Sequence, residues 1–91
     1  AQNAVYAYVG APERIIMYCD RAILDDVIDR FGTEVRMRRE DEDILVRTEV
    51  EVSPQFFGWI TGLGPGVQIL GPETVRRSYQ EHLEQILSAY K

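Results

Sequence analysis

The sequence predicts an α+β domain in which three helices cover one face of a four-stranded sheet. Short apolar runs, rich in β-branched residues or alternating with charged ones, are typical of strands. Between them lie stretches in which apolar residues recur at helical spacing. Capping residues, glycine or proline separate these stretches, as expected at the ends of helices and strands.

Length and composition restrict the class of protein. The chain has 91 residues, of which 45% are hydrophobic and 27% charged, and this predicts one folded domain with one core. No apolar run is long enough to span a bilayer and no signal peptide is apparent, so we expect a cytoplasmic protein without membrane contact. The single cysteine cannot form an internal disulfide, and the net charge of −5 argues against direct DNA binding.

The first strand is expected from Arg14 to Cys19, because its apolar run is typical of the centre of a sheet. Asp20 is a candidate N-cap for the helix that follows, and Gly32 ends that helix. The apolar face of this helix consists of Ile23, Leu24, Val27, Ile28 and Phe31. Residues 1–13 form either a linker or an extra strand, since alternating apolar residues there are followed by glycine and proline.

A hairpin follows the first helix. Val35 and Met37 alternate with arginines, and a second alternating run continues to Val52 after four acidic residues, 40–43. If these four residues form the loop, Met37 lies opposite Val46, and both strands place their apolar side chains on the same face. Arg36 then lies directly opposite Arg47 on the other face.

The second half of the chain predicts a helix, a short strand and a last helix. Ser53-Pro54 caps a helix whose apolar residues repeat at helical spacing, and glycines at 62, 64 and 66 end it. Residues 67–70 form the fourth strand, and Gly71-Pro72 opens the last helix. We expect the last helix to bury one apolar stripe, formed by Val75, Tyr79, Leu83, Ile86, Leu87 and Tyr90. On its solvent side we expect ion pairs from Glu73 to Arg77 and from Arg77 to Glu81.

The order of these elements is strand, helix, strand, strand, helix, strand, helix. Right-handed crossovers around one sheet convert this order into a ferredoxin-like βαββαβ sandwich with an additional C-terminal helix. The helices then lie on one face of the sheet, and the opposite face is left for partners.

The residues that most often carry catalysis have structural interpretations here, so we do not expect an enzyme. His82 is the single histidine, without a second metal ligand at suitable spacing, and we expect it to be half-exposed. Cys19 is expected to be a buried hydrophobe. Asp25, Asp26 and Asp29 cluster on one helix, but Arg21 lies four residues before Asp25 and Arg30 four after Asp26, which predicts a solvated helix face neutralised by ion pairs. We therefore expect no catalytic residue, no metal site and no cofactor.

The strongest candidate contact surface lies on the outer face of the sheet. Alternation places Arg36, Arg38 and Arg47 on that face, together with apolar side chains that include Tyr18 and Leu45. Opposed like charges require relief by Glu49 or Glu51, by a partner's carboxylates, or by a phosphate. We favour the local glutamates as the source of that relief. Arginine beside apolar and aromatic side chains is also typical of a partner interface, unless the N-terminal segment covers this face.

Two other positions in the sequence are weaker candidates for binding a phosphate. Gly71-Pro72 leads from a strand into a helix with Arg76 and Arg77 nearby, but Glu73 already meets the helix dipole there. An acyl-phosphate hydrolase would need a phosphate-binding loop after the first strand, where residues 19–21 offer an acidic cap and one arginine. We rank this hydrolase last.

Across residues 14–91 the sequence resembles the C-terminal extension that follows the WYL domain in bacterial transcriptional regulators. The resemblance is most specific at the end of the chain, in residues 56–60, Gly64, residues 67–72, Val75-Arg76, and Leu83, Ile86, Leu87 and Tyr90. It implies a parent protein with an N-terminal DNA-binding winged helix and a ligand-sensing WYL domain. This domain would then couple sensing to DNA binding and aid dimerisation. Its expected partners are its own WYL domain and a second copy, with DNA bound only through the N-terminal domain.

One alternative remains open within this interpretation. The same arginine-bearing face could bind an effector directly, as a site for a nucleotide, an oligonucleotide or a small anion.

Overall fold

A computed structural model describes residues 12–32 and 35–91 of the chain. In chain order its elements are strand β1 (Pro12–Asp20), turn η1 (Arg21–Ile23), helix α2 (Leu24–Phe31), strands β2 (Arg36–Glu40) and β3 (Asp43–Glu51), helix α3 (Pro54–Gly62), turn η3 (Gly64–Gly66), strand β4 (Val67–Gly71) and helix α4 (Glu73–Ser88). The predicted α+β class and the predicted order of elements are confirmed.

The described strands form one antiparallel sheet in the order β2-β3-β1-β4. Strand β1 lies inside the sheet, between β3 and β4, as its apolar run predicted. It begins two residues earlier than expected, because Pro12 and Glu13 pair with the end of β3. The remainder of the predicted linker or extra strand, residues 1–11, lies outside the described residues.

The hairpin has the predicted register but a shorter turn. Met37 lies opposite Val46 and Arg36 lies opposite Arg47, as the alternation predicted. The expectation of a four-residue acidic loop was wrong, because Glu40 and Asp43 pair with each other as the last residues of the ladder. The turn consists of Asp41 and Glu42, and Asp41 adopts a φ of 55°. Aspartate is one of the few non-glycine residues that tolerate this left-handed conformation.

Local sequence signals mark where η1, α2 and α3 begin or end. The Asp20 carboxylate accepts a hydrogen bond from the Ala22 amide at 3.0 Å and caps η1, through which the chain enters α2. Gly32 follows α2 with a φ of 68°, a conformation that glycine adopts without strain. The Ser53 hydroxyl accepts from the Phe56 amide at 3.1 Å, and Pro54 opens α3 as predicted.

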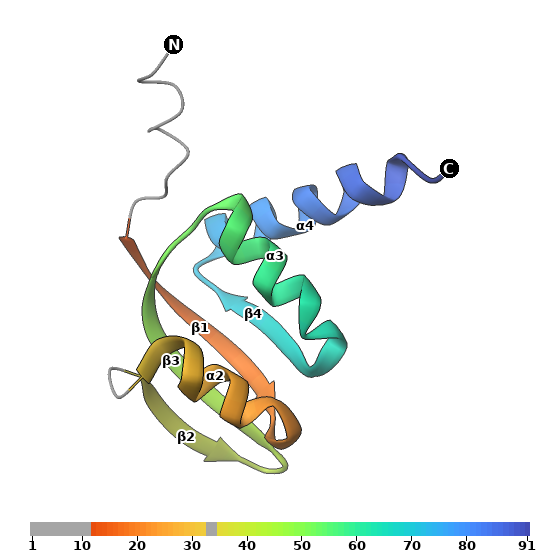
Figure 1. Cartoon of the computed structure of the whole chain (residues 1–91). Helices are drawn as coiled ribbons and strands as arrows, with labels where there is room; N and C mark the ends of the chain where they lie inside the picture. The colour runs from red at the N-terminus through yellow and green to blue at the C-terminus, as the bar shows by residue number, and fades with distance from the viewer. Residues whose placement is uncertain (1–11, 33–34) are drawn as a thin grey trace.

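The core lies between the sheet and the helices. Figure 1 shows α2 and α3 over the same face of the sheet, with the first part of α4 beside α3. Side chains that alternate along the strands point into this layer and meet the apolar faces of α2, α3 and α4. The buried cluster contains Ile15, Met17, Cys19, Val27, Ile44, Val46, Val50, Phe56, Phe57, Ile60, Val67, Ile69 and Val75. Burial of this apolar surface is the main favourable term in folding.

The expectation for α4 was largely wrong. Val75 is buried, and Tyr79 is half-buried against Phe57, with a centroid distance of 5.3 Å. The remaining residues of the predicted buried stripe are exposed: Leu83, Ile86, Leu87 and Tyr90. The cause is geometric, because the helix continues past the edge of α3 and leaves the body of the domain (Figure 1).

Candidate functional site

The five predicted contact residues lie together on the outer face of the sheet, in two neighbouring rows. Leu45 stands between Arg38 on β2 and Tyr18 on β1, and Arg36 stands opposite Arg47 in the next row. The register of the hairpin produces this arrangement, since residues on one face of a strand repeat every second position. We call the surface formed by Tyr18, Arg36, Arg38, Leu45 and Arg47 the arginine face. Its geometry agrees with the predicted placement, while its role as a contact stays a prediction.

Glu40 links two members of this face. Its carboxylate accepts a hydrogen bond from the Tyr18 hydroxyl at 3.0 Å and one from the Arg38 guanidinium at 2.6 Å. The hydrogen bond from Arg38, followed by that from Tyr18, holds the pKa of Glu40 below its usual value. The carboxylate in turn raises the pKa of Tyr18, because it accepts a hydrogen bond from the protonated phenol. Glu40 was not among the predicted contact residues, because all four acidic residues were assigned to the loop. Aspartate at position 41, which tolerates a positive φ, is the sequence signal for a two-residue turn that leaves Glu40 in the strand.

Arg36 and Arg47 remain without such a partner. Within residues 12–32 and 35–91, no carboxylate lies within ion-pair distance of either guanidinium. The expectation that Glu49 or Glu51 would neutralise them was therefore wrong. These two glutamates lie further along β3, where Glu49 stands opposite Arg14 on β1. The arginine face thus carries two opposed cations in direct register, which is unfavourable. Besides the hydrogen bond from Arg38, the charge of Arg47 helps to lower the pKa of Glu40, so this carboxylate relieves the repulsion in part without forming an ion pair with Arg36 or Arg47.

A shallow hollow of about 120 Å³ lies among these arginines. It is lined by Arg36, Met37, Arg38, Leu45 and Arg47. Leu45 is only 7% exposed, and Ile16, Tyr18 and Leu70 on the same face are half-buried. Leu45 is therefore buried, and it contributes little exposed apolar surface to this face. What the face offers is an apolar floor rimmed by guanidinium groups, which suits an anionic group attached to an apolar body.

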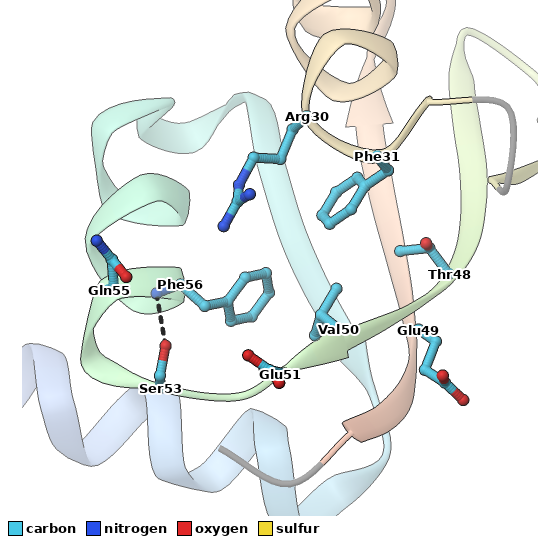
Figure 2. A pocket seen from close by; sticks show the side chains of 9 residues that line it. All are labelled: Arg30, Phe31, Thr48, Glu49, Val50, Glu51, Ser53, Gln55 and Phe56. Atoms are coloured by element: carbon cyan, nitrogen blue, oxygen red, sulfur yellow. Dashed lines mark hydrogen bonds between the residues drawn. The ribbon is translucent and has the colours of Figure 1, made fainter. Parts of the chain in front are cut away.

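A larger cleft, which no sequence pattern predicted, opens between the end of α2, β3 and the start of α3 (Figure 2). Its volume is about 430 Å³, and its lining residues are Arg30, Phe31, Thr48, Glu49, Val50, Glu51, Ser53, Gln55 and Phe56. The Arg30 guanidinium lies 5.9 Å from the centre of the Trp59 ring, within the range of a cation–π contact. The rim of the cleft carries both positive and negative side chains, so the charge of the cleft does not favour one class of ligand.

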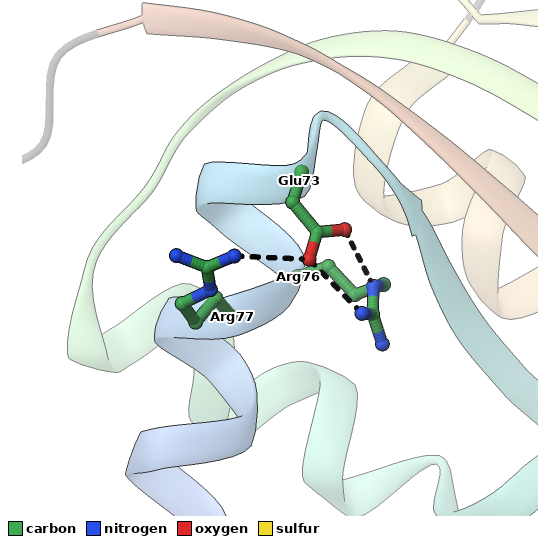
Figure 3. Close-up of polar contacts among 3 residues, drawn as sticks. All are labelled: Glu73, Arg76 and Arg77. Atoms are coloured by element: carbon green, nitrogen blue, oxygen red, sulfur yellow. Dashed lines mark hydrogen bonds and ion pairs between the residues drawn. The ribbon is translucent and has the colours of Figure 1, made fainter.

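The start of α4 is occupied by its own carboxylate. Figure 3 shows Glu73 between two arginines, with Arg76 donating at 2.9 Å and Arg77 at 3.5 Å. The predicted pair from Glu73 to Arg77 is confirmed, whereas no ion pair from Arg77 to Glu81 forms among the described residues. The hydrogen bond from Arg76 is the main reason that the pKa of Glu73 is lowered. A phosphate at this helix start would have to displace Glu73.

The remaining candidate residues have structural positions. The His82 ring is half-buried and packs 5.2 Å from the Phe57 ring, as expected of a histidine at the edge of a stripe. Cys19 is fully buried, and burial raises the pKa of its thiol to about 11. Asp25, Asp26 and Asp29 are exposed as predicted. The expected ion pairs of these aspartates with arginines of the same helical segment do not form in the described part of the chain.

The described residues contain neither a metal-binding cluster nor a membrane-spanning helix. No group of three or more histidine, cysteine, aspartate or glutamate side chains is arranged there to hold a metal ion. None of the helices in this part of the chain is both long and apolar enough to cross a membrane.

Comparison with known proteins identifies the same family that residues 56–90 resemble. No match to the chain is found among curated proteins. A family model, that of the WCX domain, matches residues 11–87. The match covers the sheet, α2, α3 and nearly all of α4. The chain therefore belongs to the WCX domain family, the C-terminal extension of WYL-domain regulators.

Proposed function

We propose that this chain is the regulatory and dimerisation domain at the C-terminal end of a WYL-type DNA-binding transcriptional regulator. It acts by contact with its partners and not as an enzyme. Those partners are the parent's own WYL domain and a second copy of the protein, and DNA is bound by another domain of the same cytoplasmic regulator. In this role the domain couples effector sensing to DNA binding.

The single observation that carries this proposal is the pair formed by Arg36 and Arg47. The two residues stand directly opposite each other in the ladder of β2 and β3, and no carboxylate of the described residues lies at ion-pair distance from either guanidinium. Carboxylates of a partner domain would relieve this repulsion through charge-assisted hydrogen bonds. Arg38 and Tyr18 are held beside the pair by Glu40, so the surface is ordered before the partner arrives. Such preorganisation lowers the entropic cost of binding.

The fold supports the same interpretation. We infer a ferredoxin-like sandwich from the order of elements and from the strand order β2-β3-β1-β4. Helices cover one face of the sheet in such a sandwich, and the other face is left for contacts. The arginine face lies on that second side.

Reversing the two opposed charges tests the proposal. In the full-length parent regulator, Arg36→Glu combined with Arg47→Glu is expected to weaken operator binding and assembly by roughly ten- to a hundredfold, because the partner's carboxylates would then meet like charges. Gel-shift titration and sedimentation velocity measure the two effects. Arg21→Glu with Arg77→Glu is the matched control, since it makes the same change in charge at two exposed positions away from the face. Unchanged assembly and operator binding in the first double variant would refute the proposal.

A second candidate function is favoured by the hollow between the arginines. An effector with a small anionic group, such as inorganic phosphate, a nucleotide or a short single-stranded oligonucleotide, would place that group between Arg36 and Arg47 above Leu45. We expect millimolar ligand to raise the melting temperature of the chain by a few degrees, and Arg47→Gln to abolish the shift. Thermal denaturation with each ligand measures this effect. If none of these ligands raises the melting temperature at millimolar concentration, the second candidate function is refuted and a protein partner remains the proposed ligand of the arginine face.

A further inference from the structure

The end of α4 carries an apolar stripe that no described part of the domain covers. Leu83 is 38% exposed, Ile86 46%, Leu87 55% and Tyr90 86%. Leu83, Ile86 and Leu87 share one side of α4 at the spacing i, i+3 and i+4, and Tyr90 follows at i+7 in the turn after the helix ends at Ser88. A contiguous apolar strip at the surface of a small domain is typical of an interaction site.

The stripe lies on an ordered helix that leaves the body of the domain. Tyr79 anchors α4 to α3, where its hydroxyl forms a hydrogen bond with that of Thr61 at 3.1 Å and its ring packs on Phe57. The C-terminal part of the helix runs free of the sheet (Figure 1). The helix ends at Ser88, and the amide of Tyr90 donates to the Leu87 carbonyl at 2.9 Å, so one further turn carries the chain on to Tyr90. A helix end without tertiary packing is marginal in water, and a partner helix would stabilise it.

We infer that this stripe pairs with the same stripe of a second copy, with the two α4 helices antiparallel. In that arrangement Leu83 of one copy meets Tyr90 of the other, and Ile86 meets Leu87, so every member of the stripe is covered by a residue of the same set. Self-complementary contact of this kind is what two-fold symmetry requires. The free end of α4 also allows a second helix to approach without collision with the sheet.

The charges beside the stripe favour a second copy as the partner, and they favour an antiparallel arrangement of the two α4 helices. Glu84 lies on the last turns of α4, and Lys91 follows three residues after the helix ends at Ser88, where its amide still donates to the Ser88 carbonyl at 3.4 Å. In the paired state, continued helical winding would place Glu84 and Lys91 on the same flank, about two turns apart. Antiparallel pairing brings equal flanks together, so that Glu84 of each copy lies near Lys91 of the other. Parallel pairing would place this flank against the opposite one, which carries Ala89 and His82 and no carboxylate. The charges thus complement a second copy in the antiparallel direction.

This inference deepens the proposed homodimer and rests on that part of the proposed function, but it uses a surface separate from the arginine face. The two can therefore fail independently. Variants of α4 are measured by self-association of the 91-residue chain, whereas variants of Arg36 and Arg47 are measured by assembly and operator binding of the full-length parent regulator.

Sedimentation equilibrium of the 91-residue chain, from micromolar to millimolar concentration, tests the pairing. We expect a monomer–dimer equilibrium in which Leu87→Glu raises the dissociation constant at least about a hundredfold, because a desolvated central leucine becomes a charge. Gln85→Glu is the matched control, since it adds the same charge to the opposite side of the same helix and should leave the dimer intact. Leu87 is exposed in the single chain, so its variant should keep the parent melting temperature at low concentration.

Charge exchange tests the direction. Glu84→Lys and Lys91→Glu should each weaken the dimer several-fold, and the double variant should restore it, because the exchanged pair has the same complementarity. Hydrogen exchange gives a second measurement, in which the amides of residues 86–90 become protected as concentration rises.

Three results would overturn the inference. These are a chain that stays monomeric at millimolar concentration, a dimer indifferent to Leu87→Glu, and a dimer that Arg47→Glu dissociates while Leu87→Glu does not. The last result would assign the second copy to the arginine face and leave the proposed function standing.

Discussion

Phe56→Ala is expected to destabilise the domain by about 3 to 5 kcal/mol, the usual cost of removing a buried phenylalanine ring. Phe56 is 1% exposed and belongs to the buried cluster between α3 and the sheet. Its ring lies 5.9 Å from that of Phe57 and 6.3 Å from that of Trp59. Removing it leaves a cavity that these two rings cannot fill without moving α3. The loss approaches the whole stability of many domains of this size.

Urea denaturation followed by Trp59 fluorescence measures this effect. Gln55→Ala is the control, because Gln55 is exposed and precedes Phe56 on the same turn of α3. It should change the free energy of unfolding by less than about 0.5 kcal/mol. Equal and small losses for the two variants would show that α3 does not face the sheet as described.

Ile15→Ala is expected to cost about 2 to 5 kcal/mol, because Ile15 is fully buried on the central strand β1. Its neighbour on β3 is Thr48, and helices close over it from the core side. The adjacent Ile16 points to the outer face and is half-buried. The same truncation at Ile16 should therefore cost less, about 1 to 2 kcal/mol.

Chemical denaturation of both isoleucine variants gives the comparison. Because the two positions are adjacent and chemically identical, differences in helix or strand propensity cancel, and the result reports which face of β1 is the core face. A larger loss of stability for Ile16→Ala than for Ile15→Ala would show that Ile16 points into the core. The arginine face would then be the buried face of the sheet. The comparison thus also tests the foundation of the proposed contact surface.

The sequence alone determined the local structure of this protein. The apolar alternation of the hairpin placed Met37 opposite Val46 and Arg36 opposite Arg47, and the structure has this register. Ser53-Pro54 and Gly32 marked the ends of their helices. These features depend on backbone preferences and on the two periodicities of helix and strand, which act over a few residues. The five residues of the arginine face followed from the same alternation.

Tertiary structure decided which side chains are covered and which charges meet. The stripe on α4 predicted burial, but periodicity states only that one side of a helix is apolar, and α4 extends beyond the surface that could cover it. Glu40 entered the arginine face because a two-residue turn kept it in β2, and the cleft beside Phe31 and Phe56 exists only where α2, β3 and α3 converge. Such contacts join residues distant in sequence, so they depend on how whole elements pack and not on any local pattern.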